Sequence, residues 1–393
     1  MQTLFWILSA LMMLLNVFTV YLGILFLFAF KKRKLYPKAS PETRFAVIIP
    51  ARNEAQVVGN LIAALRAQSY PRKKIDIYVV INNTTDDTEA VALKAGAKVI
   101  RCEGKITCKG QVLNQAFDAL KGKGYDAYAI FDADNIPDRD FMQRMNDALH
   151  AGERVCKGRL KCGNYTDSWV AGGYGLYHAL MELTYSRPHS AAGFSSNLVG
   201  TAFVAHREVI DAMGGWHTSS ICEDTEFAAQ ATRMGYRVAF VYDAMSYDEQ
   251  VADFGVSLRQ RHRWCYGMIQ CARMMTKSMF SRSCPKKGMA RDFGMLFIIS
   301  HTAPLAGVLG CISMLFQPRW MLPLMGFGVI LAILAMMLLA VFLCWYGGYP
   351  VKKMLPTILG FPLFMFSWAP IQILSLFIPV KTWSEIKHTG QAN

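Results

Sequence analysis

Short apolar runs alternate with amphipathic segments through the middle of this chain, between long apolar stretches at its two ends. Three of the short runs have the length of buried parallel strands, and they cover residues 45–50, 75–81 and 125–131. A shorter fourth strand is predicted at 98–101. Helical patterns are present in 60–67, 86–95 and 110–120. Alternating strands and helices predict an α/β sheet, in which ligands bind at the carboxyl ends of the strands.

The long apolar stretches predict membrane segments. Residues 1–30 are nearly free of charge, and the basic run Lys31-Lys32-Arg33-Lys34 follows them at once. A signal peptide carries its positive charge before a shorter apolar core, so this stretch is predicted to be a retained transmembrane anchor. The basic run then places the domain that follows on the cytoplasmic side. Further apolar segments predict a C-terminal membrane region at 291–380, and they cover 293–316, 320–346 and 354–380.

The last apolar segment, 354–380, is a poor straight span. It is interrupted by Pro356, Pro362, Pro370 and Pro379, and both of its flanks are basic. A full crossing would place the C-terminus outside, whereas the charge pattern favours the inside. We therefore expect a broken or re-entrant segment, with residues 381–393 forming a cytoplasmic tail.

Composition supports a membrane protein and argues against nucleic-acid binding. Of the 393 residues, 53% are hydrophobic, and the formal net charge is +14. The basic residues gather beside the apolar segments, where they meet anionic lipid headgroups. The ten cysteines form no Cys-x-x-Cys pair, so reduced thiols are expected rather than a zinc site.

Polar motifs recur in a fixed order between the apolar ends. They are Asn53-Glu54, Asp86, Lys109, Asp132-Ala133-Asp134, Glu223-Asp224 and Gln260-Arg261-His262-Arg263-Trp264. An Asp-x-Asp pair after an apolar strand suits a divalent metal that holds a phosphate, since hard cations prefer carboxylate oxygens. A later carboxylate can act as a general base, and an arginine beside a tryptophan can hold a diphosphate next to a sugar. Together the motifs indicate sugar transfer from a nucleotide-sugar.

From about Arg44 to Gly267, the order of these motifs resembles that of membrane-integrated family 2 glycosyltransferases of the cellulose synthase, hyaluronan synthase and poly-N-acetylglucosamine synthase type. The resemblance implies a hexosyltransferase domain of the GT-A fold at 44–250, facing the cytoplasm. It implies an interfacial helix region at 251–290 that carries the last motif. It also implies inversion at the sugar carbon and a Mg²⁺ or Mn²⁺ cofactor.

The resemblance assigns the donor side of the site residue by residue. Asp134 is the metal ligand and Asp132 a nucleotide contact, whereas a solvated turn is the alternative for this pair. The positions of Asn53, Glu54 and Asp86 hold uracil and ribose in the family. The family has an Asp-Asp pair where this chain has Asn82-Asn83. An asparagine oxygen can still accept from the uracil N–H, so a UDP-sugar remains the expected donor. Asp86 could instead cap the helix that follows it.

The remaining roles concern the reacting groups and their surroundings. Asp224 is the expected base, with Glu223 beside it, although an acidic first turn of a helix starting at Thr225 is an alternative. Lys109 lies near the nucleotide unless it is a surface lysine. The resemblance assigns further residues to donor or acceptor contacts, namely Gly200, Thr201, Gln260, Arg263, Trp264 and Trp383 in the tail.

The last motif also has a geometric prediction of its own. On a helix, Gln260, Arg263 and Trp264 share one face at i, i+3 and i+4, while His262 points elsewhere. In the family, Arg263 contacts the donor diphosphate and Trp264 stacks on the acceptor sugar. An interfacial amphipathic helix with snorkelling arginines is compatible with this role.

Three functions follow from these observations. The first is a synthase that extends a polysaccharide at the membrane, with accessory or oligomeric partners for export. The second is a transferase that adds one sugar to a membrane lipid, which the small number of hydrophobic segments favours. The third is an inactive scaffold, which the intact Asp132, Asp134 and Asp224 disfavour.

Overall fold

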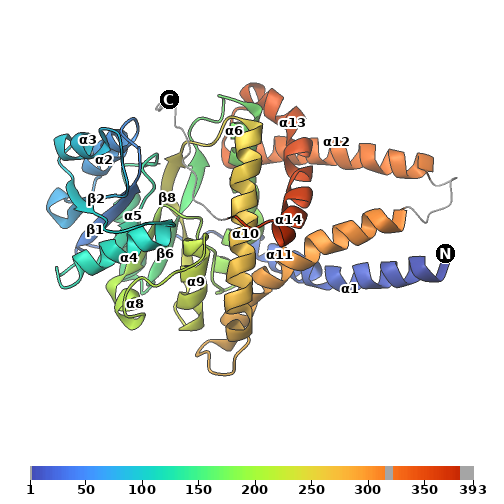
Figure 1. Ribbon diagram of the computed structural model, residues 1–393, viewed down its shortest axis with the longest axis horizontal. Coiled ribbons are helices and arrows are strands. Elements are labelled where there is room, and N and C mark those ends of the chain that lie inside the picture. Colours follow the sequence, from blue (N-terminus) through green and yellow to red (C-terminus); the bar gives the residue numbers. More distant parts are fainter. Residues whose placement is uncertain (1, 315–321, 381–393) are drawn as a thin grey trace.

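In the computed structural model, which describes residues 2–314 and 322–380, a sheet-containing domain lies at one end and long apolar helices project from the other (Figure 1). The domain is built on an eight-stranded sheet with the order β3-β2-β1-β4-β7-β6-β8-β5. Its strands are β1 Phe45–Ala51, β2 Ile75–Ile81, β3 Lys98–Arg101, β4 Ala127–Ile130, β5 Ile136–Pro137, β6 Val155–Cys162, β7 Phe203–His206 and β8 Val238–Asp248. The predicted α/β sheet is thus confirmed.

The sheet has a parallel half that was predicted and a mixed half that was not. β1 lies between β2 and β4 and pairs in parallel with both, and β3 continues the parallel half. β7 runs antiparallel to both β4 and β6, and β6 is parallel to β8. Because β1 to β4 run in one direction, the polar residues that follow β1, β2 and β4 lie at one edge of the sheet.

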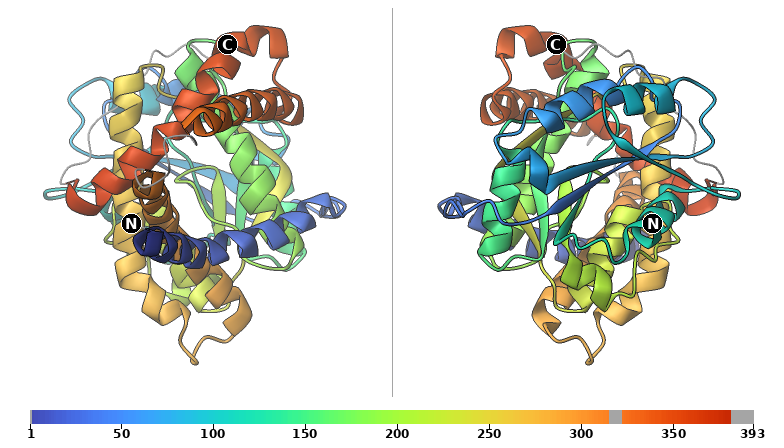
Figure 2. Two further views of the ribbon diagram at one scale, coloured as in Figure 1. Left: turned by 90° about the vertical axis from the view of Figure 1, so that its right-hand side faces the viewer. Right: turned by 90° about the vertical axis from the view of Figure 1, so that its left-hand side faces the viewer.

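Helices cover both faces of the sheet, and the side chains of β1 alternate between the two cores. Ala46 and Ile48 pack with α4 Lys109–Leu120, α8 Arg207–Ala212 and α9 Glu223–Arg233. Val47 and Ile49 pack with α2 Val58–Arg66, α3 Thr88–Lys94 and α5 Phe141–His150. The right-hand view of Figure 2 shows the helices on opposite sides of the strands. All seven residues of β1 are buried, as expected for a central strand with both faces covered.

Two helical segments lie between the sheet and the apolar helices. The first is α6 Trp169–Met181, which continues through a π-helical stretch, Glu182–Ser186, into α7 Arg187–Ala191. The second is α10 Phe254–Met279, a 26-residue helix that carries the Gln-Arg-His-Arg-Trp motif. In Figure 1, α10 stands between the sheet and the long apolar helices.

Four described segments are long and apolar enough to cross a membrane, namely Ser9–Phe30, Lys287–Met314, Pro323–Gly347 and Val351–Phe377. The helices of these segments are α1 Gln2–Phe26, which begins before the first segment, α11 Lys287–Met314, α12 Leu322–Gly347, α13 Leu355–Phe366 and α14 Trp368–Phe377. Helix α1 packs along α11. The predicted interruption of 354–380 is confirmed, because α13 and α14 are separate helices that meet at Ser367. The structure does not describe residues 315–321, where one predicted segment ends and the next begins, or the tail 381–393.

Candidate active site

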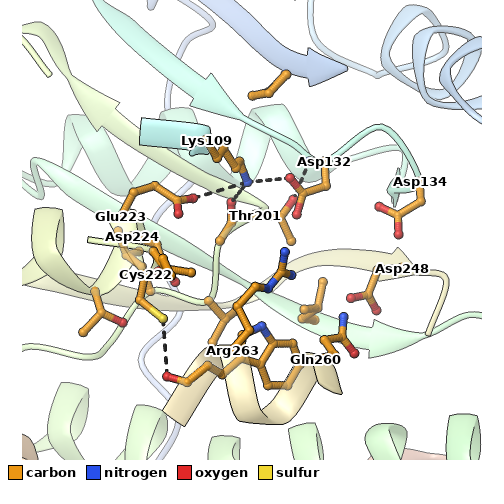
Figure 3. A pocket seen from close by; sticks show the side chains of 18 of the residues that line it. Lys109, Asp132, Asp134, Thr201, Cys222, Glu223, Asp224, Asp248, Gln260 and Arg263 are labelled. Atoms are coloured by element: carbon orange, nitrogen blue, oxygen red, sulfur yellow. Dashed lines mark hydrogen bonds and ion pairs between the residues drawn. The ribbon is translucent and has the colours of Figure 1, made fainter. Parts of the chain in front are cut away.

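A cavity of about 320 Å³ opens where the ends of β1, β4 and β8 meet α9 and α10 (Figure 3). Eleven of the residues singled out in the sequence line it, namely Glu54, Lys109, Asp132, Asp134, Gly200, Thr201, Glu223, Asp224, Gln260, Arg263 and Trp264. They come from segments more than two hundred residues apart in the chain. The fold therefore brings the early strand-end motifs and the late helix motif to one place.

The Asp-x-Asp loop is anchored by Thr201. Asp132 follows β4, and its backbone N–H donates to Thr201 Oγ1 over 2.8 Å. The Thr201 hydroxyl in turn donates to Asn135 Oδ1. Gly200 and Ala202, on either side of Thr201, both have a positive φ, which lets the chain turn sharply into β7. Thr201 thus contacts the loop that carries Asp132 and Asp134 and fixes it against β7.

Lys109 links the two acidic motifs. Its Nζ donates to Asp132 Oδ1 and to Gly200 O at 2.7 Å, and it lies 3.6 Å from Glu223 Oε1 (Figure 3). Its side chain is only 11% exposed, so it is not the surface lysine of the alternative interpretation. Burial disfavours the charged ammonium, but the nearby carboxylates of Asp132 and Glu223 outweigh it and raise the pKa of Lys109. Lys109 is therefore a charged group inside the cavity wall.

Glu223 and Asp224 form the first turn of α9, which begins two residues earlier than predicted. Both are buried. Burial raises the pKa of Glu223 to about 7, and Lys109 opposes this rise. Burial also raises the pKa of Asp224, while the backbone N–H groups of Thr225 and Gly200 lower it. A buried carboxyl with a raised pKa that faces a cavity fits an acid–base role.

Carboxyl groups crowd the side of the cavity near Asp134. Burial raises the pKa of Glu54 to about 9, and the charges of Asp134 and Asp132 add to the rise. Burial raises the pKa of Asp248 well above its usual range, and the same two aspartates contribute. A divalent cation would relieve this repulsion, and the oxygen ligands suit Mg²⁺ or Mn²⁺. Within residues 2–314 and 322–380, no three acidic, His or Cys side chains are placed to hold a metal. Phosphate oxygens would have to complete the coordination, as Mg²⁺ sites commonly require.

Helix α10 presents one face of its motif to the cavity. Gln260, Arg263 and Trp264 line it, whereas Arg261 and His262 do not, which confirms the predicted spacing. In Figure 3 the guanidinium of Arg263 points into the space between the Asp224 side and the Asp134 side. A cation and an indole thus lie next to the carboxylates of the sheet edge.

Three residues expected near the nucleotide are outside the cavity lining, and a fourth lies outside the described residues. Asn53 has a φ of 58°, and its Oδ1 accepts from the backbone N–H of Thr85 over 2.8 Å. Asp86 accepts from the backbone N–H groups of Ala55 and Thr88 at 3.1 and 3.0 Å, so it joins the loop after β1 to the start of α3. The alternative of a helix cap is met only in part, because Asp86 bonds the first helical residue, Thr88, whereas the N-cap position is Asp87. Asn82 is buried at the end of β2. Trp383 is in the tail that the structure does not describe.

Sequence reasoning missed several cavity residues, of which Asp248, Glu249 and Gln250 are the most notable. Asp248 is the last residue of β8 and the other two follow it, and Asp248 accepts from the Gln250 side chain over 2.5 Å. The available signal in the sequence was the apolar run at 238–241. Recognising it as a strand would have predicted polar residues at one more carboxyl end. Tyr177 and His178, from α6, also line the cavity.

Residues 41–267, more than half of the chain, match the family model described as "Glycosyltransferase like family 2". The chain belongs to this family. It is therefore a family 2 glycosyltransferase, and the matched residues contain every cavity motif named above.

Two curated relatives show the range of the family. The chain is 25% identical over 291 residues to the catalytic subunit of the UDP-forming cellulose synthase of Pseudomonas fluorescens, covering 70% of this chain and 39% of the relative. It is 24% identical over 325 residues to the beta-monoglucosyldiacylglycerol synthase of Synechocystis, covering 81% of this chain and 65% of that protein. The chain thus spans less than two thirds of the length of either relative.

A solved structure supports the fold. The mannosyltransferase PcManGT from Pyrobaculum calidifontis, in complex with GDP-Man and Mn²⁺, superposes with a TM-score of 0.65 at 18% sequence identity. The match covers 93% of this chain and 99% of the neighbour. The GT-A type α/β fold expected from the sequence is thereby confirmed.

Proposed function

We propose that this glycosyltransferase is membrane-bound, faces the cytoplasm and moves a sugar with inversion from a UDP-sugar to a growing polysaccharide at the membrane. The observation that carries this proposal is the single cavity that joins the Asp132–Asp134 loop to Asp224, Arg263 and Trp264. Those groups are the ones that a diphosphate donor and a sugar acceptor need on either side of the reacting carbon.

The acidic loop and two basic side chains form the donor side. Asp134 would hold the divalent cation, which neutralises the charge that develops on the leaving diphosphate. Arg263 extends into the cavity and would bind the same diphosphate through its guanidinium. Lys109 keeps Asp132 in place through its ion pair, so Asp132 remains available to the nucleotide. The nucleotide is thus held from several directions before the acceptor arrives.

The Asn82 side chain supports a nucleobase near the end of β2. Both of its polar side-chain atoms are buried and lack a hydrogen-bond partner among the described residues. A buried amide without partners is costly, and a uracil ring offers both an N–H and carbonyl oxygens to satisfy it. Asn53, in the neighbouring loop, holds the strand-end geometry through Thr85. The uracil donor is therefore proposed from the resemblance at these positions, although Asn82 and Asn53 lie outside the cavity lining, and the donor experiment below tests the base.

Asp224 would take the proton of the acceptor hydroxyl. The hydroxyl oxygen then attacks the anomeric carbon as the bond to the diphosphate breaks, which inverts the configuration at that carbon. Trp264 lines the cavity beside Arg263 and would stack on the acceptor sugar. Gln260 and the Gly200 loop also line the cavity. The partly apolar lining would limit the access of water, which would compete with the acceptor.

The pH dependence of transfer should reflect the protonation of Asp224. A base must be ionised, and burial raises the pKa of this carboxyl above that of an exposed aspartate. As the pH is lowered, kcat/KM for transfer should fall because protonation of Asp224 removes the base. This fall should come at a higher pH than it would for an exposed aspartate. The profile is measured at saturating cation over about pH 4 to 8. The residual activity of Asp224→Asn should not show this fall at low pH. If the fall is unchanged in the variant, a group other than Asp224 causes it.

A second candidate acceptor is a membrane lipid. The match to the beta-monoglucosyldiacylglycerol synthase covers more of this chain than the match to cellulose synthase does. The few hydrophobic segments also favour a product that needs no translocation channel. The two candidates share the donor chemistry and differ only in what receives the sugar.

Donor and product are separated by one experiment. Membranes that contain the enzyme are incubated with labelled UDP-glucose, UDP-N-acetylglucosamine or GDP-mannose, and the products are divided into a lipid extract and a polymer fraction. Label in polymer from a UDP-sugar supports the main proposal, and label in lipid supports the alternative. Transfer from GDP-mannose alone would contradict the uracil site, and no transfer with any donor would contradict both proposals.

The tail gives a prediction about topology, although it lies outside the described residues. Two crossings between the basic runs at 282–287 and 352–353, followed by a segment that returns to its starting side, bring Trp383 back to the catalytic face. A reporter cysteine at Asn393 should then be labelled from the cytoplasm, and Trp383→Ala should lower transfer. Labelling only from the outside would contradict the re-entrant arrangement and leave the tail without a catalytic role.

A further inference from the structure

The junction between α13 and α14 is held by a residue of the catalytic helix. Pro370 has no backbone N–H, so it cannot donate to the carbonyl four residues earlier, and the chain turns at Ser367. Arg261, next to the cavity residue Gln260, is fully buried and points away from the cavity. Its Nη1 donates to Phe364 O at 3.0 Å and to Ser367 Oγ at 2.8 Å. Arg261, the second residue of the Gln-Arg-His-Arg-Trp motif, therefore binds the turn between α13 and α14.

The surroundings of Arg261 are aromatic as well as polar. Its guanidinium lies 4.4 Å from the ring centroid of Phe364 and 5.3 Å from that of Trp368. A buried guanidinium is costly unless hydrogen bonds and ring faces compensate for the lost water. Because these partners all lie within five residues of the junction, Arg261 favours this one arrangement of α13 and α14.

Trp368, the first residue of α14, packs against two residues that line the cavity. Its ring is stacked on Tyr177 with centroids 4.9 Å apart and planes at 23°. It is also stacked with Trp264, at 6.5 Å and 25°. Tyr177 comes from α6, Trp264 from α10 and Trp368 from α14. The three rings therefore join the apolar segment of α13 and α14 to the part of the cavity that Trp264 lines.

Close packing of α6 and α13 keeps this arrangement in place. A Cβ atom on Gly173 would lie 2.9 Å from the ring of Phe364, so only glycine permits the observed approach. Tyr174, the next residue of α6, contacts both Phe364 and Trp264 edge to face, with centroids 5.1 and 5.8 Å apart. The glycine- and aromatic-rich part of α6, residues 172–177, thus forms the contact surface for the junction.

We propose that the α13–α14 junction is a positioning device for the acceptor site, in which Arg261 fixes Trp368 and Trp368 fixes the ring planes of Trp264 and Tyr177. This inference rests on the proposed function through the acceptor role of Trp264. Arg261 and Trp368 are positioning residues here, since neither lines the cavity. Disturbing the junction should weaken the acceptor's binding and leave the donor's binding unchanged.

The kinetic test uses the full chain purified in lipid nanodiscs. Its acceptor is the lipid or polymer fraction that the wild-type enzyme labels in the experiment above. Arg261→Met and Trp368→Ala should raise the acceptor KM by roughly 3- to 10-fold, the size of aromatic-pair contributions, with no change in the donor KM. Trp368→Phe keeps a ring and should stay close to wild type. Arg259→Met, an exposed arginine on the same helix, is the matched control.

A spectroscopic readout tests the geometry without turnover. The stacked Trp264–Trp368 pair should give a coupled near-ultraviolet circular dichroism signal that Trp368→Phe removes and Arg261→Met alters. If Arg261→Met does not fold, Ser367→Ala removes only the hydroxyl partner and should shift the same signal in the same direction.

The outcomes separate this inference from the proposed function. Unchanged acceptor KM in Trp368→Ala, or a parallel rise in donor KM, would overturn the inference while transfer itself stands. An unaltered dichroism signal in both Arg261→Met and Ser367→Ala would also overturn it. Failure of the wild-type enzyme to transfer from any donor would instead contradict the proposed function, and the dichroism would still decide whether Arg261 positions Trp368.

Discussion

Replacing Asp224 with Asn should lower turnover by roughly 10²-fold or more, while the donor still binds. The change keeps the size of the side chain and removes its basicity. Asp224 is buried in the first turn of α9 and faces the cavity between Lys109 and Arg263. Without a base, the acceptor hydroxyl must lose its proton to solvent, and no positioned group takes that proton as the new bond forms.

The measurement compares turnover with donor affinity. Single-turnover transfer gives the chemical step, and titration with UDP by calorimetry gives the affinity of the nucleotide. Asp118→Asn is a suitable control, because this carboxylate lies on the exposed side of α4. If Asp224→Asn weakened UDP binding as much as it slowed transfer, Asp224 would belong to the nucleotide site instead.

Replacing Asp134 with Ala should abolish transfer in a protein that still folds and inserts. In the proposed site this carboxylate holds the divalent cation, and the oxygen-rich surroundings of Glu54, Asp132 and Asp248 offer a cation a favourable potential. Losing one of the few protein ligands removes the charge that stabilises the leaving diphosphate.

The cation requirement is measured on the unmodified enzyme as well. EDTA should stop transfer, and Mn²⁺ or Mg²⁺ should restore it. Asp138→Ala changes an exposed carboxylate directly after β5 and should behave like wild type in both assays. Full activity in the presence of the chelator would contradict the assignment of Asp134, and circular dichroism shows whether the variant has kept its fold.

Much of the catalytic half was predictable because its signals are local. A run of buried apolar residues ended by a polar motif marks the carboxyl end of a strand, and Asn53-Glu54, Asn82 and Asp132 all lie at such ends. The helical spacing of Gln260, Arg263 and Trp264 predicted their common face without any knowledge of the partners. The prolines of 354–380 likewise predicted a broken segment, since proline acts on its own stretch of backbone, but they did not locate the break at Ser367, and Pro362 lies inside α13.

The rest depended on which distant segments meet. The sequence by itself determined the α/β class, the strand ends, the face of α10 and the apolar segments, because these follow from local periodicity and backbone chemistry. Only the tertiary structure placed Asp248 in the acidic wall and paired Lys109 with Asp132 and Glu223. It also turned Arg261 away from its motif toward Phe364, 103 residues later. Nothing in a short window of sequence encodes such contacts, since they arise when separate elements pack and each buried charge must find a partner.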